Sequence, residues 1–330
     1  MEGLRGILGQ AQAVGVLRRA LASDRLAHAY LFEGPAGVGK ATTARALMQA
    51  LACERTPGEG CGACPPCRKI DEGTHPDLVV VGLQDEKRDI LIAQVRDVVR
   101  GCAFRPHEAP RRLVLIDPAD RMNANAANAL LKTLEEPPEA THFVLVAEAP
   151  SRLPITIRSR CQRVRFAPLS AAVIAAELER LPGVDAAAAR FTAGLSDGSL
   201  GRALALSAGG LEERRGAAER LHAAARTGGA AEIFLASSEL GRDKEELVEV
   251  LALLRVLYRD ALLAREGLDD VAPLVNSDRP EQVRAIAAGG GWLGMRRRVA
   301  AVAEAEWALQ GNVNAQLVLD RLMLRLRECH

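Results

Sequence analysis

The chain has 330 residues, of which 48% are hydrophobic and 26% charged, a composition typical of soluble globular proteins and not of disordered or membrane-embedded ones. Its 43 basic and 42 acidic residues give a formal charge of +1, which argues against the broad positive surface of a stand-alone nucleic-acid binder. The length predicts two or three domains. Polar residues interrupt the first ten positions and no later run has membrane-spanning length, so we expect a cytoplasmic protein.

Short β-branched runs alternate with helical stretches in the first half of the chain, which is the pattern of an α/β domain with a mostly parallel sheet. In one helical stretch Leu91, Val95, Val98 and Cys102 share a face, so Cys102 is expected in the core. The expected strands cover residues 28–34, 77–82, 111–118, 142–148 and 162–168.

A glycine-rich loop, GPAGVGK, follows the first expected strand and precedes a helix. Backbone N–H groups of such a loop converge with the helix N-terminus on an anion. Gly34, Gly37, Gly39 and Lys40 are therefore candidates for binding the phosphates of ATP or ADP. The alternative is a chance glycine-rich turn, against which the lysine and the strand–loop–helix context argue. Ala41 stands where P-loops carry the hydroxyl that ligates magnesium.

Four of the seven cysteines crowd into one short segment after that helix, with the spacing C-x7-C-x2-C-x2-C. Thiolates at these spacings can surround a tetrahedral zinc ion, and four sulfur ligands leave no open position for catalysis. A disulfide pair or four idle thiols are the alternatives, which a chain without secretory features disfavours. The predicted ligands of a structural zinc ion are Cys53, Cys61, Cys64 and Cys67.

The third expected strand ends near Asp117, where nucleoside triphosphatases carry the acid that organises magnesium. Pro118 follows it and offers no acceptor to orient an attacking water. With Ala41, this predicts a degenerate nucleotide site that does not hydrolyse ATP, unless Thr42 and Asp120 substitute for the missing groups. Whether the cradle still holds a nucleotide stays open.

Strand patterns stop after residue 168, three short helical stretches follow to residue 207, and the remainder is helical with turn signals between its segments. The sequence therefore predicts an α/β region followed by an all-α region. The expected domains are a nucleotide-binding-like domain at 1–168, a helical lid at 169–207 and a helical oligomerisation domain at 208–330.

Two patterns near the C-terminus concern packing and charge. One helical stripe predicts burial within its own domain. An arginine run is expected on a solvated helix face, with contact to DNA or to acidic partners as the alternative. The stripe is Leu319, Leu322, Met323 and Leu326, and the run is Arg296–Arg298.

Four motifs, in their order and spacing, resemble those of the AAA+ clamp-loader ATPases of bacterial replication: GPAGVGK, the cysteine insertion, NALLKTLEEPP from residue 128 and SRC from residue 159. The resemblance is strong over the first 207 residues. It implies a P-loop parallel-sheet domain with a zinc module at about 53–67, a small three-helix lid and a C-terminal helical collar that joins subunits in a ring.

The chain departs from the motor subunits of that family, the γ/τ type, which carry intact P-loop, acidic and sensor residues. Ala41 and Pro118 replace two of these, VAEAP at 146–150 replaces the polar sensor, and Gly201 stands at the second-sensor arginine, with Arg202 one place further on. The resemblance therefore implies a subunit without independent catalysis. An active γ/τ-type ATPase is the alternative.

Arg160 of the SRC motif matches the arginine that such a subunit presents to ATP bound by its neighbour. An arginine inserted across an interface stabilises the charge on the transferred phosphoryl group. The implied partners are γ/τ and δ subunits in a heteropentamer, with the sliding clamp and primed DNA reached through the assembly. A zinc-dependent DNA-binding module is a third reading, which the near-neutral charge disfavours.

Overall fold

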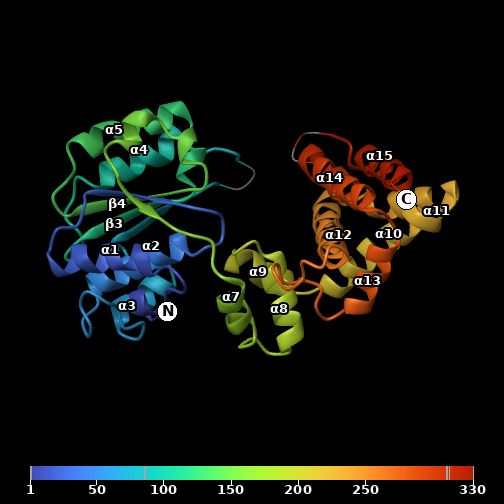
Figure 1. The fold of residues 1–330 in the computed structure, drawn as a ribbon. Coiled ribbons are helices and arrows are strands. Elements are labelled where there is room, and N and C mark those ends of the chain that lie inside the picture. The colour runs from blue at the N-terminus through green and yellow to red at the C-terminus, as the bar shows by residue number, and fades with distance from the viewer. Residues whose placement is uncertain (1, 85–86, 310, 312, 330) are drawn as a thin grey trace. The chain divides into compact units, whose positions relative to one another are not determined.

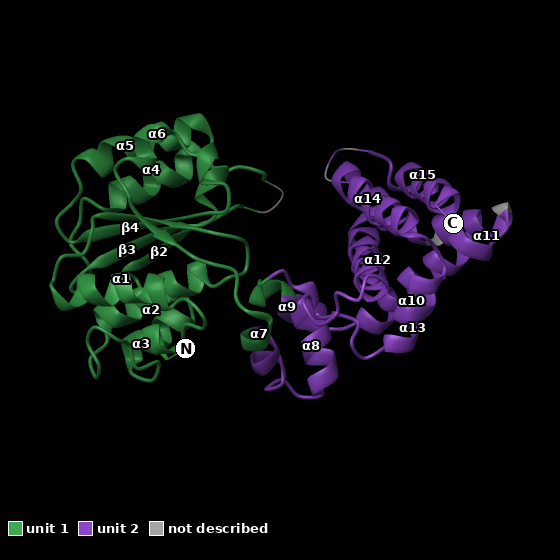
Figure 2. Cartoon of the chain, in the orientation of Figure 1, with its two compact units in different colours: residues 1–173, 198–202 green, residues 174–197, 203–330 purple. Residues whose placement is uncertain are grey.

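A computed structural model describes residues 2–84, 87–309, 311 and 313–329, which fall into two compact units (Figures 1 and 2). Unit 1 comprises Met1–Val173 and Gly198–Arg202, and unit 2 comprises Ile174–Asp197 and Ala203–His330. The α/β region lies in unit 1 and the all-helical region in unit 2, so the predicted fold class is confirmed.

Unit 1 is built on one parallel sheet, which within the described residues has five strands in the order β2-β3-β4-β1-β5. β1, β3 and β4 are buried along their whole length, as expected for parallel strands that are covered on both faces. All five predicted strands are confirmed. Their bounds are β1 Ala29–Glu33, β2 Leu78–Val81, β3 Arg112–Ile116, β4 Thr141–Ala147 and β5 Gln162–Arg165.

Helices cover both faces of this sheet, α1, α2 and α3 on one and α4, α5 and α6 on the other (Figures 1 and 2). The alternation of side chains along each strand feeds two separate cores. Tyr30 and Phe32 pack with α1 and α2, whereas Leu31 packs with α4 and α5 beside the buried Cys102, as predicted for that cysteine. These helices are α1 Ala11–Ala22, α2 Lys40–Ala52, α3 Pro65–Asp71, α4 Ile92–Gly101, α5 Ala124–Glu135 and α6 Ile155–Arg158.

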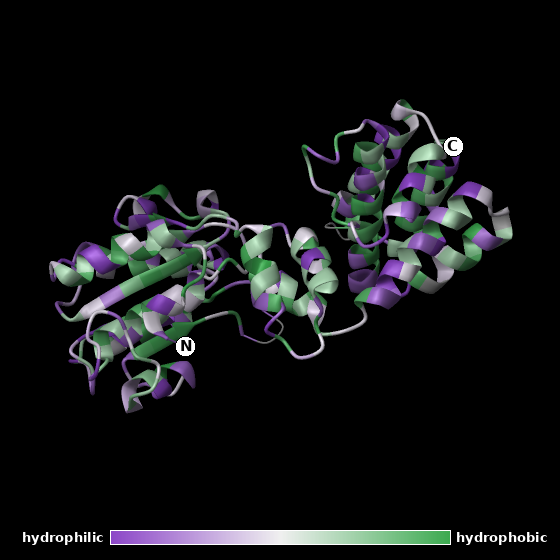
Figure 3. Cartoon of the chain, turned by 60° about the horizontal axis from the view of Figure 1, so that its bottom comes forward, coloured by the Kyte–Doolittle hydropathy of each residue, from purple (hydrophilic) through white to green (hydrophobic). Residues whose placement is uncertain are grey.

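Hydrophobic residues follow the strands, and hydrophobic and hydrophilic residues alternate along the helices (Figure 3). This is the distribution expected where helices cover a buried sheet or pack with one face against each other. Across the part of the chain that the structure describes, no helix has the length and apolar character needed to cross a membrane.

Unit 2 is a helical body whose core is centred on α12. α7 begins in unit 1 and ends in unit 2, and α9 is likewise divided between the units. The domain boundaries at residues 168 and 207 therefore remain predictions. The helices from α7 onward are α7 Ala171–Leu178, α8 Ala186–Leu195, α9 Leu200–Ser207, α10 Leu211–Thr227, α11 Ala230–Leu240, α12 Lys244–Arg265, α13 Pro280–Ala288, α14 Trp292–Leu309 and α15 Ala315–Glu328.

The C-terminal stripe is buried in this core, as predicted, with Leu319 and Leu326 fully inaccessible. The arginine run behaves differently from its prediction. Arg296 is exposed, but Arg298 is fully buried and donates to the carbonyl of Cys329 at 3.1 Å. The solvated-face interpretation was wrong for Arg298, because the helical period places it on the same face as the buried Met295.

Candidate functional site

The glycine-rich loop connects β1 to α2 at the carboxyl end of the sheet, and α2 begins at Lys40. Gly37 has a φ of +66°, and a Cβ atom there would lie 2.2 Å from the Ser199 hydroxyl. Gly39 caps the helix with a φ of +97°. Both positions need the left-handed backbone that glycine adopts without strain, so the loop has the backbone form of a phosphate cradle.

Lys40 is turned back onto its own loop. Its Nζ donates to the Gly34 carbonyl at 2.7 Å and to the Pro35 carbonyl, and the side chain is only 5% exposed. In a working P-loop the lysine points at the β- and γ-phosphates. Here the ammonium group is occupied by backbone carbonyls of the cradle itself.

Three carboxylates act electrostatically on this lysine. Burial lowers the pKa of Lys40, and the carboxylates of Glu148, Asp117 and Asp120 oppose that effect. Burial also raises the pKa of Asp117, against the influence of Lys40. Asp120 accepts a hydrogen bond from the Ala149 N–H at 2.9 Å, so one carboxylate oxygen faces the turn after β4. The acid at Glu148 was missed in the sequence, where it is the last residue of the fourth expected strand; in the structure it directly follows β4.

The residues after Lys40 place no hydroxyl at the usual magnesium position. Ala41 packs against the apolar core, and the neighbouring Thr42 is exposed. The hydroxyl of Thr43 donates to the Gly39 carbonyl at 2.8 Å and so serves the helix itself.

Residues 198–202 contact the glycine-rich loop at Gly37, although more than 150 residues separate them from it in the sequence. The Gly201 N–H donates to the Gly37 carbonyl at 3.0 Å. A Cβ atom on Gly201 would come within 3.1 Å of the Gly37 Cα atom, so glycine permits this close approach. The predicted second-sensor position thus lies against the P-loop backbone.

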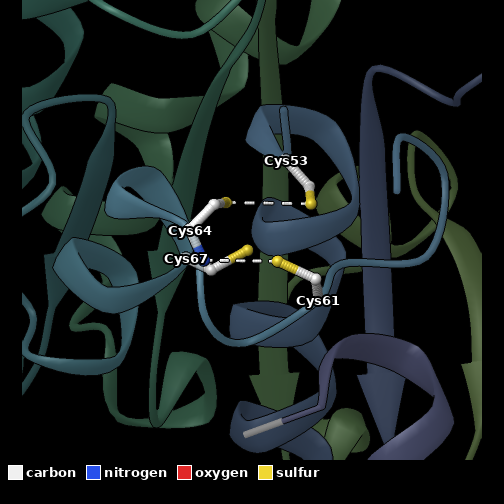
Figure 4. A group of neighbouring side chains, drawn as sticks. All are labelled: Cys53, Cys61, Cys64 and Cys67. Atoms are coloured by element: carbon white, nitrogen blue, oxygen red, sulfur yellow. Dashed lines mark hydrogen bonds between the residues drawn. The ribbon is translucent and has the colours of Figure 1, made fainter. Parts of the chain in front are cut away.

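The four clustered cysteines converge from the end of α2, the following loop and α3 (Figure 4). Their four sulfur atoms all lie within 4.8 Å of one another, and Cys53 Sγ is 3.8 Å from Cys64 Sγ. Zn–S bonds of 2.3 Å in a tetrahedron require S–S separations of about 3.8 Å. Backbone N–H groups of Thr56 and Cys64 donate to Cys53 Sγ and Cys61 Sγ. The spacing and these donors fit a tetrahedral tetrathiolate metal site.

The thiols of this cluster differ in acidity. Burial raises the pKa of Cys53, but hydrogen bonds from the hydroxyl and N–H of Thr56 outweigh it and lower that pKa to about 6. Burial raises the pKa of Cys67 to about 12. Because metal ligation requires thiolates, protons would compete with a metal ion for these sulfurs.

The loop between the first two metal-site cysteines holds the N-terminal segment in place. The Leu4 N–H donates to the Glu59 carbonyl at 2.9 Å, and the Glu59 carboxylate accepts from Arg18 Nη2 at 2.8 Å. A few residues further on, the Gln10 amide donates to the Val38 carbonyl of the P-loop at 3.2 Å. The cysteine module and the cradle are therefore linked through residues 4–10, which sequence reasoning did not anticipate because these contacts have no local periodicity.

Arg160 lies between α6 and β5, on backbone anchored by the buried Ile157 and Cys161. Its Nη1 donates to the Thr156 carbonyl at 2.9 Å, and its Nη2 lies 2.6 Å from Glu135 Oε1 at the end of α5. The side chain is 35% exposed. Within the described residues, no hydrogen bond or ion pair connects Arg160 to Lys40 or to the glycine-rich loop.

Comparison with known families gives two matches. A family model described as DNA polymerase III, delta subunit, matches residues 9–170. A second, described as DNA polymerase III, delta subunit, C terminal, matches residues 210–328. Together the two models span the sheet domain and most of the helical region.

Individual relatives agree with these models. The DNA polymerase III subunit δ′ of Bacillus subtilis is 33% identical over 323 residues, covering 97% of this chain and 96% of that protein. The δ′ subunit of Pseudomonas aeruginosa is 41% identical over 192 residues, covering 57% of this chain and 58% of that protein. The τ subunit of B. subtilis is 32% identical over 206 residues, covering 61% of this chain and 36% of that protein. The chain therefore belongs to the δ′ family of DNA polymerase III clamp-loader subunits.

Proposed function

We propose that this chain is a non-hydrolysing stator of the clamp loader, which supplies Arg160 in trans to ATP bound by a neighbouring γ/τ-type subunit. Its partners are γ/τ- and δ-type subunits of a cytoplasmic ring that loads the sliding clamp onto primed DNA. The proposal has two parts, a nucleotide site that does no chemistry and an arginine that acts elsewhere.

The observation that carries the first part is the state of Lys40. Its ammonium group is buried and bonded to the Gly34 and Pro35 carbonyls, while Ala41 beside it has no hydroxyl to offer magnesium. Thr42 is exposed, so its hydroxyl does not replace the missing magnesium ligand. The glycine-rich loop then has a structural role and no catalytic one.

Charge supports the same conclusion. A triphosphate brings several negative charges to a cradle where the carboxylates of Glu148, Asp117 and Asp120 already act electrostatically on Lys40. Like charges a few ångströms apart repel, and most strongly where water is excluded. Magnesium would relieve that repulsion, but the P-loop hydroxyl that ligates it is missing. We infer that ATP or ADP binds here weakly at best and is not hydrolysed.

The second part concerns Arg160, which lies partly exposed between α6 and β5. Its guanidinium contacts Glu135 and the Thr156 carbonyl and not the glycine-rich loop of its own chain. A guanidinium presented to the transferred phosphoryl group of a neighbour is worth orders of magnitude in rate. The cysteine cluster binds zinc in this proposal and has a structural role, because four thiolates leave no open coordination position.

Reconstitution with γ/τ- and δ-type subunits, sliding clamp and primed DNA tests both parts. The chain alone should show no ATP turnover above background. Arg160→Ala should leave assembly intact and slow hydrolysis at the adjoining site by about 10³-fold or more, the usual value of such an arginine. Arg180→Ala, which removes an exposed arginine in unit 2, is the matched control and should leave turnover unchanged.

Two results would contradict the proposal. An unchanged hydrolysis rate with Arg160→Ala removes that residue from its role. Steady turnover by the isolated chain, abolished by Lys40→Ala, would instead establish an active γ/τ-type ATPase.

A further inference from the structure

The guanidinium of Arg160 makes two contacts, one with α6 and one with the end of α5. The Thr156 carbonyl accepts from Nη1 at 2.9 Å, and Glu135 Oε1 lies 2.6 Å from Nη2. Ile157, on the preceding turn, is fully buried. A guanidinium has five N–H donors, so these two contacts leave others for an external anion.

Glu135 occupies a position that its own helix disfavours. It is the last residue of α5, where the helix dipole places partial negative charge and acids are unfavourable. The last turns of α5 are anchored by the buried side chains of Leu130 and Leu134, and Pro137 prevents α5 from continuing. The half-exposed Glu135 carboxylate pairs with Arg160, whose positive charge offsets both this acid and the partial negative charge at the end of α5.

We propose that Glu135 is a positioning residue for Arg160, an inference that rests on the proposed function. A free arginine side chain loses much rotamer freedom when it engages a phosphoryl group. The contact with Glu135 restricts those rotamers before the neighbour arrives, so less ordering remains for the transition state. Glu135 touches neither nucleotide nor water in this role; it acts through Arg160.

The test measures ATP hydrolysis by the full chain assembled with γ/τ- and δ-type subunits, clamp and primed DNA. Glu135→Ala should lower kcat by about two- to fivefold, the rate equivalent of one exposed ion pair. KM for ATP should not change, because the neighbour's own cradle binds the nucleotide. Glu136→Ala removes the same charge one residue further on, outside the contact with Arg160, and should leave both constants unchanged.

A second pair of variants separates positioning from a merely structural effect. In an Arg160→Ala background, Glu135→Ala should cause no further loss. If Glu135→Ala alone leaves kcat unchanged or raises it, or if its effect persists without Arg160, the inference is overturned. Should Arg160→Ala itself have no effect, the proposed function fails and this inference with it, whereas an effect of Arg160→Ala without one of Glu135→Ala rejects the inference alone.

Discussion

Replacing Lys40 by methionine distinguishes a structural lysine from a phosphate-binding one. Methionine keeps most of the apolar stem but removes the ammonium group, which donates to the Gly34 carbonyl at 2.7 Å and to the Pro35 carbonyl. If these bonds are the purpose of the lysine, the variant should unfold more easily while the assembled clamp loader hydrolyses ATP at the wild-type rate.

The size of the effect follows from the contacts. Hydrogen bonds from a charged donor contribute about 1.5–3 kcal/mol each. Removing the ammonium group also removes its desolvation cost, which lowers the pKa of Lys40 in the folded chain, so we expect a net loss of about 2 kcal/mol. For a domain of this size that corresponds to an unfolding temperature lower by about 4–8 °C.

Thermal unfolding of the full chain, followed by circular dichroism, and ATP turnover of the reconstituted complex below that temperature provide the two readouts. Lys132→Met, which removes an exposed lysine on α5, is the matched control and should shift neither. An unchanged unfolding temperature together with lost turnover would refute the argument, because it would show that Lys40 serves a bound nucleotide.

Three further predictions concern unit 1. Metal analysis should find about one zinc per chain; Cys61→Ser should weaken its binding and Cys329→Ser should not, because only the first lies in the cluster. Glu59→Ala should retain zinc but speed amide hydrogen exchange at Leu4, because the carboxylate that holds the loop is gone; unchanged exchange would count against the link. Burial raises the pKa of the Asp77 carboxyl, but hydrogen bonds from three backbone N–H groups outweigh burial and keep that pKa below its usual value. These bonds therefore stabilise the fold above about pH 4, and the stabilisation is lost as the pH falls further. Asp77→Asn should therefore lower stability by about 2–4 kcal/mol at pH 7 and flatten the acid limb of the stability curve measured by urea unfolding.

Much of unit 1 was predictable from the sequence. Parallel strands covered on both faces are continuous apolar runs, so β1, β3 and β4 were visible as such. The cysteine cluster was also predictable, because ligands separated by two residues are brought together by one turn of chain. The missing hydroxyl at Ala41 and the missing carboxylate at Pro118 are matters of residue type alone.

Long-range contacts were beyond sequence reasoning. No periodicity indicates that Gly201 lies against Gly37, or that Glu135 is the residue that holds Arg160. Arg298 shows the same limit on a smaller scale, since a run of arginines predicts exposure and only the phase of α14 against its neighbours decides which one is buried.

The sequence by itself thus determined which chemical groups the chain possesses and which it lacks: a lysine in a glycine-rich loop, four clustered thiols, an arginine before the last strand, and no ligand at Ala41. The tertiary structure alone decided how those groups are used. Lys40 faces its own carbonyls, and Arg160 is paired with Glu135. The physical reason is that residue type and local spacing set the chemistry available, whereas the partner of a charged side chain depends on which distant segments packing brings within hydrogen-bond distance.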